Sequence, residues 1–207
     1  MLNAGRAITP LLEDARVVDR WGEPSALAEL SIGGLAGHLV RALETIEVYL
    51  DEPEPPDEGL IDASVYFAGG TSAPIDLDNP AQRAIRERGE QAGAVGPAAL
   101  AADHQARIGR LATRFASEPS ERRLVVMGGA VRIRLDDYLP TRLVEITVHA
   151  DDLAVSVGAD TPRFSADVLS IAIDVLVGTA RHRHGDLAVL RALTRRERDA
   201  VDALRVL

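Results

Sequence analysis

One stretch of the sequence, residues 139–157, carries side chains that could hold a metal ion or move a proton. In a helix, the side chains on one stripe of about 80° are all polar: Arg142, Glu145, His149, Asp152 and Ser156. Apolar residues flank the stripe on both sides, so we expect it to face the protein interior, with Thr147 and Asp151 on the solvent face. Because buried charge is costly unless it is paired or bound to metal, the pattern predicts a polar network or a metal site.

Glu145 and His149 are the strongest candidates within this stripe. Residues four apart on a helix lie one above the other, so both side chains can reach one ion. In the alternative reading, Arg142 pairs with Glu145 or Asp152, and His149 makes a hydrogen bond in the core. Asp152 could instead orient a metal ligand, and Arg142 could bind an anionic group of a cofactor or substrate. The stripe alone leaves these readings open.

A second helix places another histidine toward the interior. Over residues 32–50, His38 lies within a three-and-four spacing of apolar residues, which is typical of a buried face. A lone histidine there is more often a core residue than a ligand. The chain has only five histidines, however, so two that face the core beside a buried Glu145 favour a metal site. His104 lies near the apolar stripe of a third helix, where it lines a pocket as a catalytic candidate or belongs to the core.

The elements that must position these residues are mostly helical. Ser31 is the expected N-cap of the second helix, Asp136 or Asp137 that of the helix carrying Glu145, and Gly158 its expected end. The acidic, proline-rich residues 51–59 predict a loop, and residues 60–78 an irregular connection. Two short apolar runs, 124–127 and 131–135, predict a β-hairpin. The expected helices are 2–21, 32–50, 80–116 with a break at 93–97, 138–157, 165–181 and 194–207.

Composition narrows the class of function. The net charge is −9, which repels phosphate backbones, so nucleic acid is not an expected partner. The chain has no cysteine, so it cannot supply a thiol nucleophile or a zinc–thiolate site. It shows no leader peptide and no apolar run long enough to cross a membrane, so we expect a cytoplasmic protein. The expected fold is mainly α: a four-helix bundle with a short β-hairpin and extra C-terminal helices.

Three blocks of this sequence resemble the mycothiol-dependent maleylpyruvate isomerase N-terminal domain, a DinB-like family. The first contains Trp21, Pro-Ser-Ala-Leu at 24–27 and Leu-Ser-Ile-Gly-Gly-Leu-Ala-Gly-His-Leu at 30–39. The second is Arg-Leu-Val-Glu-Ile-Thr-Val-His-Ala-Asp-Asp-Leu-Ala at 142–154. The third, at 185–198, is similar to the end of short actinobacterial members. Where the family usually has Trp before the Ser31 position, this chain has Leu30.

The resemblance implies a DinB-like bundle over residues 1–160, with residues 161–207 as a helical extension packed on it. It also implies a divalent metal, usually zinc, held by His38, Glu145 and His149, and mycothiol as the thiol cosubstrate. The isomerase proper carries a further α/β domain, for which residues 159–207 are too few. Maleylpyruvate isomerisation is therefore in doubt, and a mycothiol S-transferase or another thiol-dependent reaction on a small electrophile is expected.

Two other functions stay open at this point. The chain could be a non-catalytic bundle that binds a metal or small ligand, because a fold does not guarantee activity. It could also be an interaction protein in which His38, Glu145 and His149 form only a buried polar network. The sequence leaves open the electrophile, the thiol, the identity of the divalent metal and whether the chain forms a homodimer.

Overall fold

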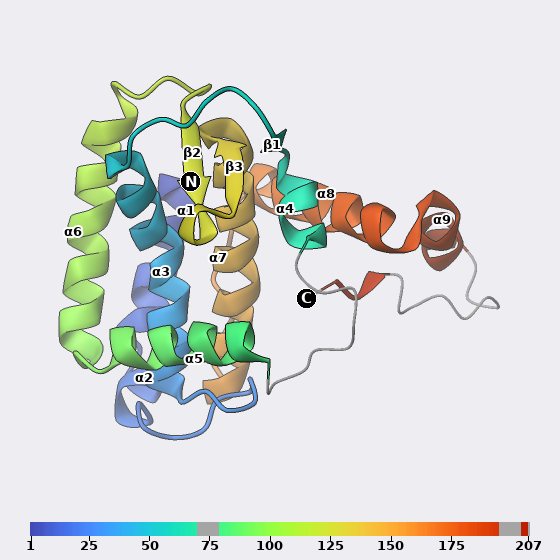
Figure 1. The fold of residues 1–207 in the computed structure, drawn as a ribbon. Coiled ribbons are helices and arrows are strands. Elements are labelled where there is room, and N and C mark those ends of the chain that lie inside the picture. The colour runs from blue at the N-terminus through green and yellow to red at the C-terminus, as the bar shows by residue number, and fades with distance from the viewer. Residues whose placement is uncertain (70–78, 195–203, 207) are drawn as a thin grey trace.

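The computed structural model describes residues 1–69, 79–194 and 204–206, and in these ranges the chain is mainly helical with one small sheet (Figure 1). This confirms the expected fold class. No helix in the described ranges is both long and apolar enough to cross a bilayer. The helices are α1 (Leu2–Leu12), α2 (Ala15–Asp19), α3 (Ile32–Asp51), α4 (Ala63–Ala68), α5 (Pro80–Gly93), α6 (Pro97–Phe115), α7 (Leu135–Val157), α8 (Ala166–His184) and α9 (Asp186–Thr194).

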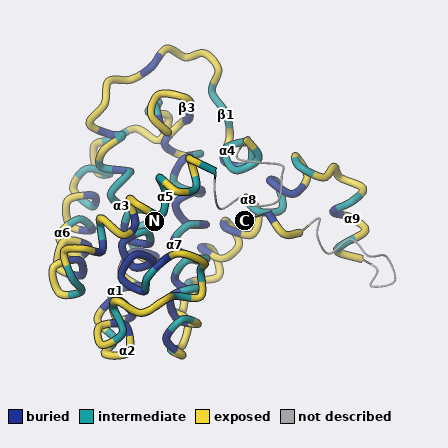
Figure 2. Tube along the Cα trace, turned by 60° about the horizontal axis from the view of Figure 1, so that its bottom comes forward, coloured by how far each residue is buried: buried dark blue, intermediate teal, exposed yellow. Residues whose placement is uncertain are grey.

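Four of these helices, α1, α3, α6 and α7, form the bundle (Figure 1). Helix α3 packs against α6 and α7, and α1 packs against the same two helices from the other side. Their apolar faces meet in one core, and Figure 2 marks in dark blue the buried residues along the helices. The core includes fully buried side chains from each helix: Ile8, Leu35, Leu39, Leu43, Ile46, Leu111, Ile146 and Leu153.

Local signals in the sequence set several helix ends as expected. The Ser31 side chain accepts a hydrogen bond from the Gly34 N–H and begins α3. Gly158 adopts the left-handed conformation, with φ of 67°, and ends α7. The expected break between 93 and 97 separates α5 from α6, where Gly96 has φ of 85° and Pro97 follows.

Three local predictions were wrong, and a fourth falls mostly outside the described residues. The helix expected over 2–21 is two helices, because the Asp14 side chain caps a new helix by accepting from the Arg16 N–H. Helix α7 begins at Leu135 without a side-chain cap, since the carbonyls of Arg122 and Ser120, which precede β2, accept from the N–H groups of Leu135 and Asp136. Residues expected to be irregular contain α4, capped by the Asp62 side chain. The last described helix is α9, which ends where a helix was expected to begin; most of 194–207 lies outside the described residues.

The predicted hairpin is present and has a third strand. Strands β2 (Arg123–Val126) and β3 (Val131–Arg134) pair antiparallel, with Leu124 opposite Ile133. Strand β1 (Leu60–Ile61), which the sequence did not suggest, pairs parallel with β3. The sheet order is therefore β1-β3-β2. The sheet lies at one end of the bundle, where β1 leads directly into α4 (Figure 1).

Helix α8 covers the side of α7 that was expected to face solvent. Ala172 and Val175 of α8 pack with Val144 of α7 and Ala63 of α4. Thr147 is consequently buried and its hydroxyl donates to the Leu143 carbonyl, so the predicted solvent face was wrong there. Helix α8 also holds α4 in place (Figure 1): the Thr179 hydroxyl donates to the Ser64 carbonyl at 3.2 Å.

Glycines allow α5 to cross α3 at very short range. A Cβ added to Gly93 would lie 2.2 Å from the Gly33 carbonyl oxygen, and one added to Gly37 would lie 2.3 Å from the Gly89 carbonyl oxygen. These close approaches require the absence of a side chain, because the opposing atoms are backbone and cannot move aside. The crossing matters for the site because it brings α5 next to His38: a Cβ on Gly89 would lie 3.3 Å from the His38 Cβ.

Gly93→Ala is expected to lower the free energy of unfolding by about 1–3 kcal/mol, because the added methyl group overpacks the crossing of α3 and α5. The matched control is Gly109→Ala on α6, where an added Cβ meets nothing within 4 Å. That change should be neutral or stabilise by up to about 1 kcal/mol through helix propensity. Urea unfolding followed by circular dichroism measures both. Equal effects of the two substitutions would contradict the packing argument.

Candidate metal centre

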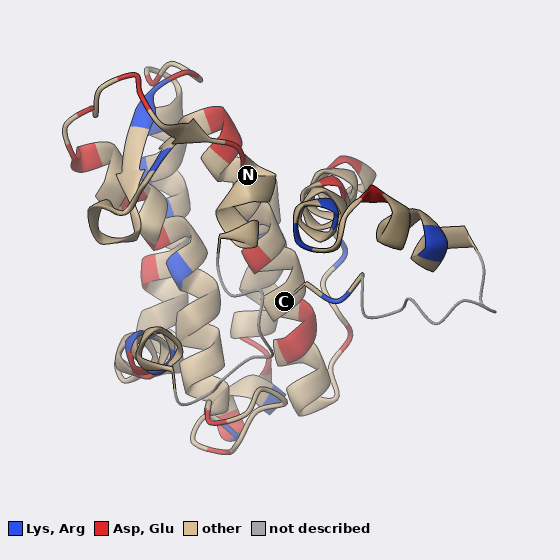
Figure 3. Ribbon diagram, turned by 45° about the vertical axis from the view of Figure 1, so that its right-hand side comes forward, with Lys and Arg blue, Asp and Glu red and all other residues tan. Residues whose placement is uncertain are grey.

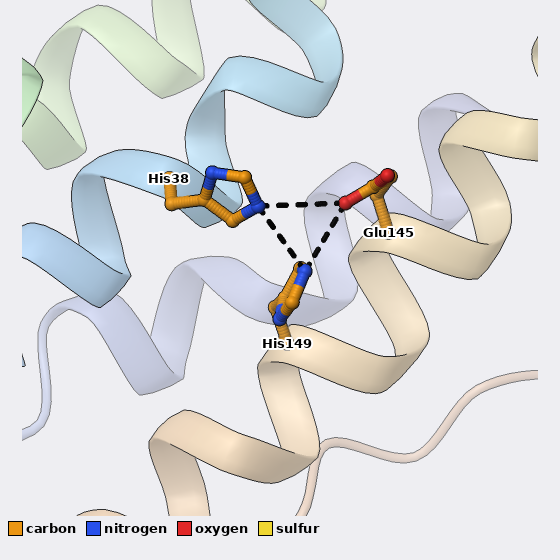
Figure 4. A group of neighbouring side chains, drawn as sticks. All are labelled: His38, Glu145 and His149. Carbon is orange, nitrogen blue, oxygen red and sulfur yellow. Dashed lines mark hydrogen bonds and ion pairs between the residues drawn. The ribbon is translucent and has the colours of Figure 1, made fainter. Parts of the chain in front are cut away.

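Three side chains from two bundle helices point at one another in the interior (Figure 4). His38 comes from α3, and Glu145 and His149 come from successive turns of α7. The Nε2 atoms of His38 and His149 lie 3.2 Å apart. The Glu145 Oε2 lies 3.1 Å from the His149 Nε2 and 3.5 Å from the His38 Nε2. The structure thus brings together the three residues that the sequence singled out.

The donor set and its spacing fit a divalent metal. Two imidazole nitrogens and one carboxylate oxygen are the ligands of a typical catalytic zinc site with an open position. Zinc–ligand bonds of about 2.0–2.2 Å in tetrahedral geometry place neighbouring ligand atoms about 3.3–3.6 Å apart. The three observed separations, 3.1, 3.2 and 3.5 Å, are close to this range. His38, Glu145 and His149 can therefore converge on one ion with little movement.

The charges at this centre are arranged to favour a cation. Burial alone would raise the pKa of Glu145, but hydrogen bonds from His149 and His38 and the nearby Arg142 charge hold it well below its usual range. Burial likewise disfavours the charged form of His149, yet its contacts with Asp152 and Glu145 raise its pKa to about 9. In the metal-free protein at neutral pH, a proton on His149 thus occupies the place where a metal cation would bind.

Asp152 orients His149 from the far side of the ring. Its Oδ2 lies 3.0 Å from the His149 Nδ1, so the carboxylate accepts the Nδ1–H and turns Nε2 toward Glu145 and His38. This contact decides between the two readings of Asp152, because its carboxylate contacts His149 and makes no ion pair with Arg142 among the described residues. Ser156, the last residue of the stripe, accepts from the Ala26 N–H and anchors a loop.

Asp152→Asn is expected to weaken zinc binding by about 10–100-fold, which is the usual effect of removing a partner that orients a histidine ligand. The control is Asp151→Asn, which changes the neighbouring carboxylate; Asp151 is exposed and hydrogen-bonded to Thr161 instead. Competition with a chromogenic chelator gives both affinities. An unchanged affinity in Asp152→Asn, or an equal loss in both variants, would show that Asp152 does not act through His149.

The other two candidates lie in different places. The Arg142 side chain is only 8% exposed, and its Nη2 lies 3.8 Å from Glu145 Oε1, too far for a hydrogen bond. His104 on α6 is buried against α1, where its Nε2 lies 2.9 Å from the Gly5 carbonyl oxygen. Burial lowers its pKa, so it stays neutral and donates that hydrogen bond. The geometry of His104 is that of a core histidine, away from the metal ligands.

A pocket of about 550 Å³ opens beside the three ligands. His38 and Glu145 form part of its wall, and α3, α4, α5, α7 and the β2–β3 turn supply the rest. Several wall residues were not identified from the sequence. Arg41 lies one turn after His38 and Tyr138 one turn before Arg142, so helical spacing could have suggested both. Tyr66 and Arg88 offered no such signal, because their place depends on how α4 and α5 pack.

Comparison with known proteins agrees with this geometry. Residues 2–154 match the family model described as the mycothiol maleylpyruvate isomerase N-terminal domain. No curated protein and no solved structure matches the chain significantly. The matched range contains all four bundle helices up to the last turn of α7, and with them His38, Glu145 and His149. Because the match spans well over half of the sequence, the chain belongs to the mycothiol maleylpyruvate isomerase N-terminal domain family.

Proposed function

We propose that this protein is a metal-dependent transferase or isomerase that joins a low-molecular-weight thiol to a small electrophile. The observation that carries the proposal is the convergence of His38, Glu145 and His149 beside a pocket large enough for a small molecule, whose wall includes His38 and Glu145. Membership of a mycothiol-related family supports a thiol as the cosubstrate. The absence of cysteine supports it as well, because the sulfur nucleophile must then come from a bound molecule.

The three ligands would hold a divalent metal, with zinc the expected ion. When bound, such an ion lowers the pKa of a thiol and so supplies a thiolate nucleophile at neutral pH. Glu145 stays ionised and contributes the negative charge of the site. Asp152 holds the His149 ring in its binding orientation. The chain's own task is thus to position charge and to shape the pocket.

The tyrosines of the pocket serve as hydrogen-bonding walls and not as bases. Burial raises the pKa of both Tyr66 and Tyr138, so each keeps its hydroxyl proton near neutral pH. The Tyr138 hydroxyl contacts the Thr45 hydroxyl at 2.9 Å, which fixes the ring. The pocket wall next to the ligands therefore carries tyrosine hydroxyls that keep their protons. Hydroxyls held in place in this way can orient a bound substrate.

The test is a thiol-conjugation assay with the zinc-loaded protein, mycothiol and monochlorobimane. In the expected reaction the thiolate displaces chloride, so that a sulfur–carbon bond forms, the carbon–chlorine bond breaks and the thiol proton passes to solvent. We expect turnover that requires both the thiol and the metal and that is lost in His38→Ala. The exposed-site variant His182→Ala is the matched control and should keep full activity.

The main alternative is a bundle that binds a metal or a small ligand without catalysis. Stoichiometric zinc binding together with no thiol-dependent turnover, for monochlorobimane and for a panel of unsaturated acids and epoxides, would favour that function. A rate that is the same for the wild type and for His38→Ala would remove the three ligands from the chemistry altogether.

A further inference from the structure

Helix α4 is too short to be stable by itself. It has six residues, whereas an isolated helix is marginal in water below about 12–15 residues. The Asp62 side chain caps its first turn, and β1 pairs with β3 just before it. Its position must therefore come from packing against other helices. Helix α8 contacts α4 more extensively than α7 does and lies alongside it (Figure 1).

The first turn of α4 packs closely against α8. A Cβ added to Gly178 would lie 2.2 Å from the Ser64 Oγ and 2.9 Å from the Ser64 Cβ. The Thr179 hydroxyl contacts the Ser64 carbonyl oxygen at 3.2 Å. Ala63 is buried in a small apolar cluster with Val175 of α8. The first turn of α4 thus depends on residues of α8 for hydrogen bonding and for packing.

Arg183 of α8 binds the other end of α4. Its Nη2 donates to the Phe67 carbonyl, and its Nη1 donates to the Val206 carbonyl at 2.7 Å. The last four carbonyls of a helix have no partner within that helix, and a cation near them is favourable. Arg183 is part of the basic last turn of α8, whose arginines are blue in Figure 3. One guanidinium thus joins α8 to α4 and to Val206.

The residue before Phe67 brings α4 into the pocket beside the three ligands. Tyr66 is the only α4 residue in the wall of that pocket among those described. Its hydroxyl accepts from the Arg142 Nη2 at 3.1 Å, and the Arg142 Cζ lies 5.4 Å from the centroid of its ring. Arg142 in turn neighbours Glu145, with 3.8 Å between Nη2 and Oε1. The position of α4 therefore sets the position of Tyr66 in the pocket wall.

We propose that Arg183 is a positioning residue for this site: it holds α4 on α8, so that Tyr66 stays against Arg142 in the pocket wall. Arg183 is not itself in that wall, so its effect must pass through α4. The match to the family model ends at residue 154, before α8 begins at Ala166. Residues beyond the matched domain are therefore needed to complete the pocket. Only the effect on turnover rests on the proposed thiol-dependent function.

Amide hydrogen exchange in the metal-free full chain tests the positioning without relying on turnover. Arg183→Met keeps an apolar stem and removes the charged donor, so exchange over residues 63–69 should rise by about tenfold or more, the usual size of a charge-assisted hydrogen bond. Exchange over α3 should stay at the wild-type rate. The matched control Arg181→Met changes an exposed arginine of the same turn, which pairs with Asp186 instead, and should leave α4 unchanged. No rise over residues 63–69, or an equal rise over α3, would overturn the proposal.

A packing variant tests the contact at the other end of α4. The methyl group of Gly178→Ala would collide with Ser64, so it should also raise exchange over residues 63–69, although alanine by itself favours the α8 helix. Adding Ser64→Gly removes both colliding atoms and should lower the exchange again. Such a rescue identifies the contact between α4 and α8, because a second destabilising change would not reverse a general loss of stability. Unchanged exchange in Gly178→Ala would contradict the role of α8.

Turnover of the zinc-loaded protein then tests whether Arg183 acts through Tyr66. In the thiol-conjugation assay, Arg183→Met should lower kcat/KM by about tenfold or more, because small displacements of a positioning group are costly. Zinc affinity should not change, since the three ligands lie on α3 and α7. In Tyr66→Ala, where no ring is left to position, Arg183→Met should have no further effect, and additive losses would overturn the link to Tyr66. If the wild type shows no turnover, the proposed function fails and the exchange measurements alone decide the positioning.

Discussion

His149→Ala is expected to abolish stoichiometric binding of a divalent metal and to leave the helical circular dichroism close to that of the wild type. The substitution removes the ligand that contacts both other members of the centre, at 3.2 Å from the His38 Nε2 and 3.1 Å from Glu145 Oε2. Outer partners of metal ligands alone change affinity by about 10–100-fold, so loss of a ligand should cost at least about a hundredfold. The bundle core does not include His149, so the helices should persist.

Elemental mass spectrometry of the purified, untagged protein measures this effect. After removal of metal and addition of zinc, the wild type should carry about one zinc per chain and His149→Ala close to none. His182→Ala on α8 changes an exposed histidine and controls for nonspecific binding. Full zinc occupancy in His149→Ala would contradict the assignment of His149 as a metal ligand. A wild type that takes up no zinc would indicate that the three residues form only a polar network and do not bind a metal.

Zinc affinity is expected to fall steeply with decreasing pH over the neutral range. A histidine must lose its proton to bind a metal, and the pKa of His149 in the metal-free protein is about 9. Each pH unit below that value should therefore weaken binding by about tenfold, or about a hundredfold from pH 8.5 to 6.5. The pKa of Glu145 lies well below its usual range, so this carboxylate adds no pH dependence there.

Titration calorimetry in buffers of different ionisation enthalpy checks the prediction directly, because zinc binding at pH 7 should release about one proton from His149. Asp152→Asn is the informative variant. It removes a hydrogen bond that raises the pKa of His149, so the steep region should begin at a lower pH. An affinity that does not change between pH 8.5 and 6.5 would show that His149 is neutral before zinc binds.

The raised pKa of His149 also affects the stability of the metal-free protein, which should fall as the pH increases. The pKa of His149 is raised above the unfolded value of about 6.5, so the imidazolium stabilises the fold fully below that pH. This stability is lost as the pH rises through about 9, and its size is roughly 3 kcal/mol for a side chain that is 18% exposed. Metal-free protein should therefore unfold at lower urea concentration at pH 9.5 than at pH 6.5. His149→Gln should remove the difference.

Much of the centre could be predicted from the sequence, for a local reason. Glu145 and His149 are four residues apart in a segment with apolar flanks, so helix geometry alone places them together and turns them inward. His38 lies within the apolar spacing of its own helix, which also turns it inward. That the two helices are neighbours was implied by the family resemblance, and the structure brings His38 within 3.2 Å of His149.

The pocket could not be predicted in the same way. Tyr66 lies on α4, in a segment whose sequence indicated only an irregular connection, and α4 is held in place by α8. Arg88 reaches the pocket because α5 crosses α3 where glycines of the two helices lie in close contact. The spacing of apolar residues in the sequence does not predict this crossing. The face of α7 that bears Thr147 was expected to be exposed because the pattern within α7 does not show that the next helix, α8, folds back against it.

The sequence by itself thus determined the mainly helical class, the hairpin, several helix ends and the three candidate ligands. These depend on interactions within a few residues of one another, such as helical spacing, caps and left-handed glycines. Only the tertiary structure decided which helices neighbour α3 and α7, and that Tyr66 of α4 lies against Arg142 of α7. These features depend on contacts between elements far apart in the chain, and local patterns do not encode which elements meet.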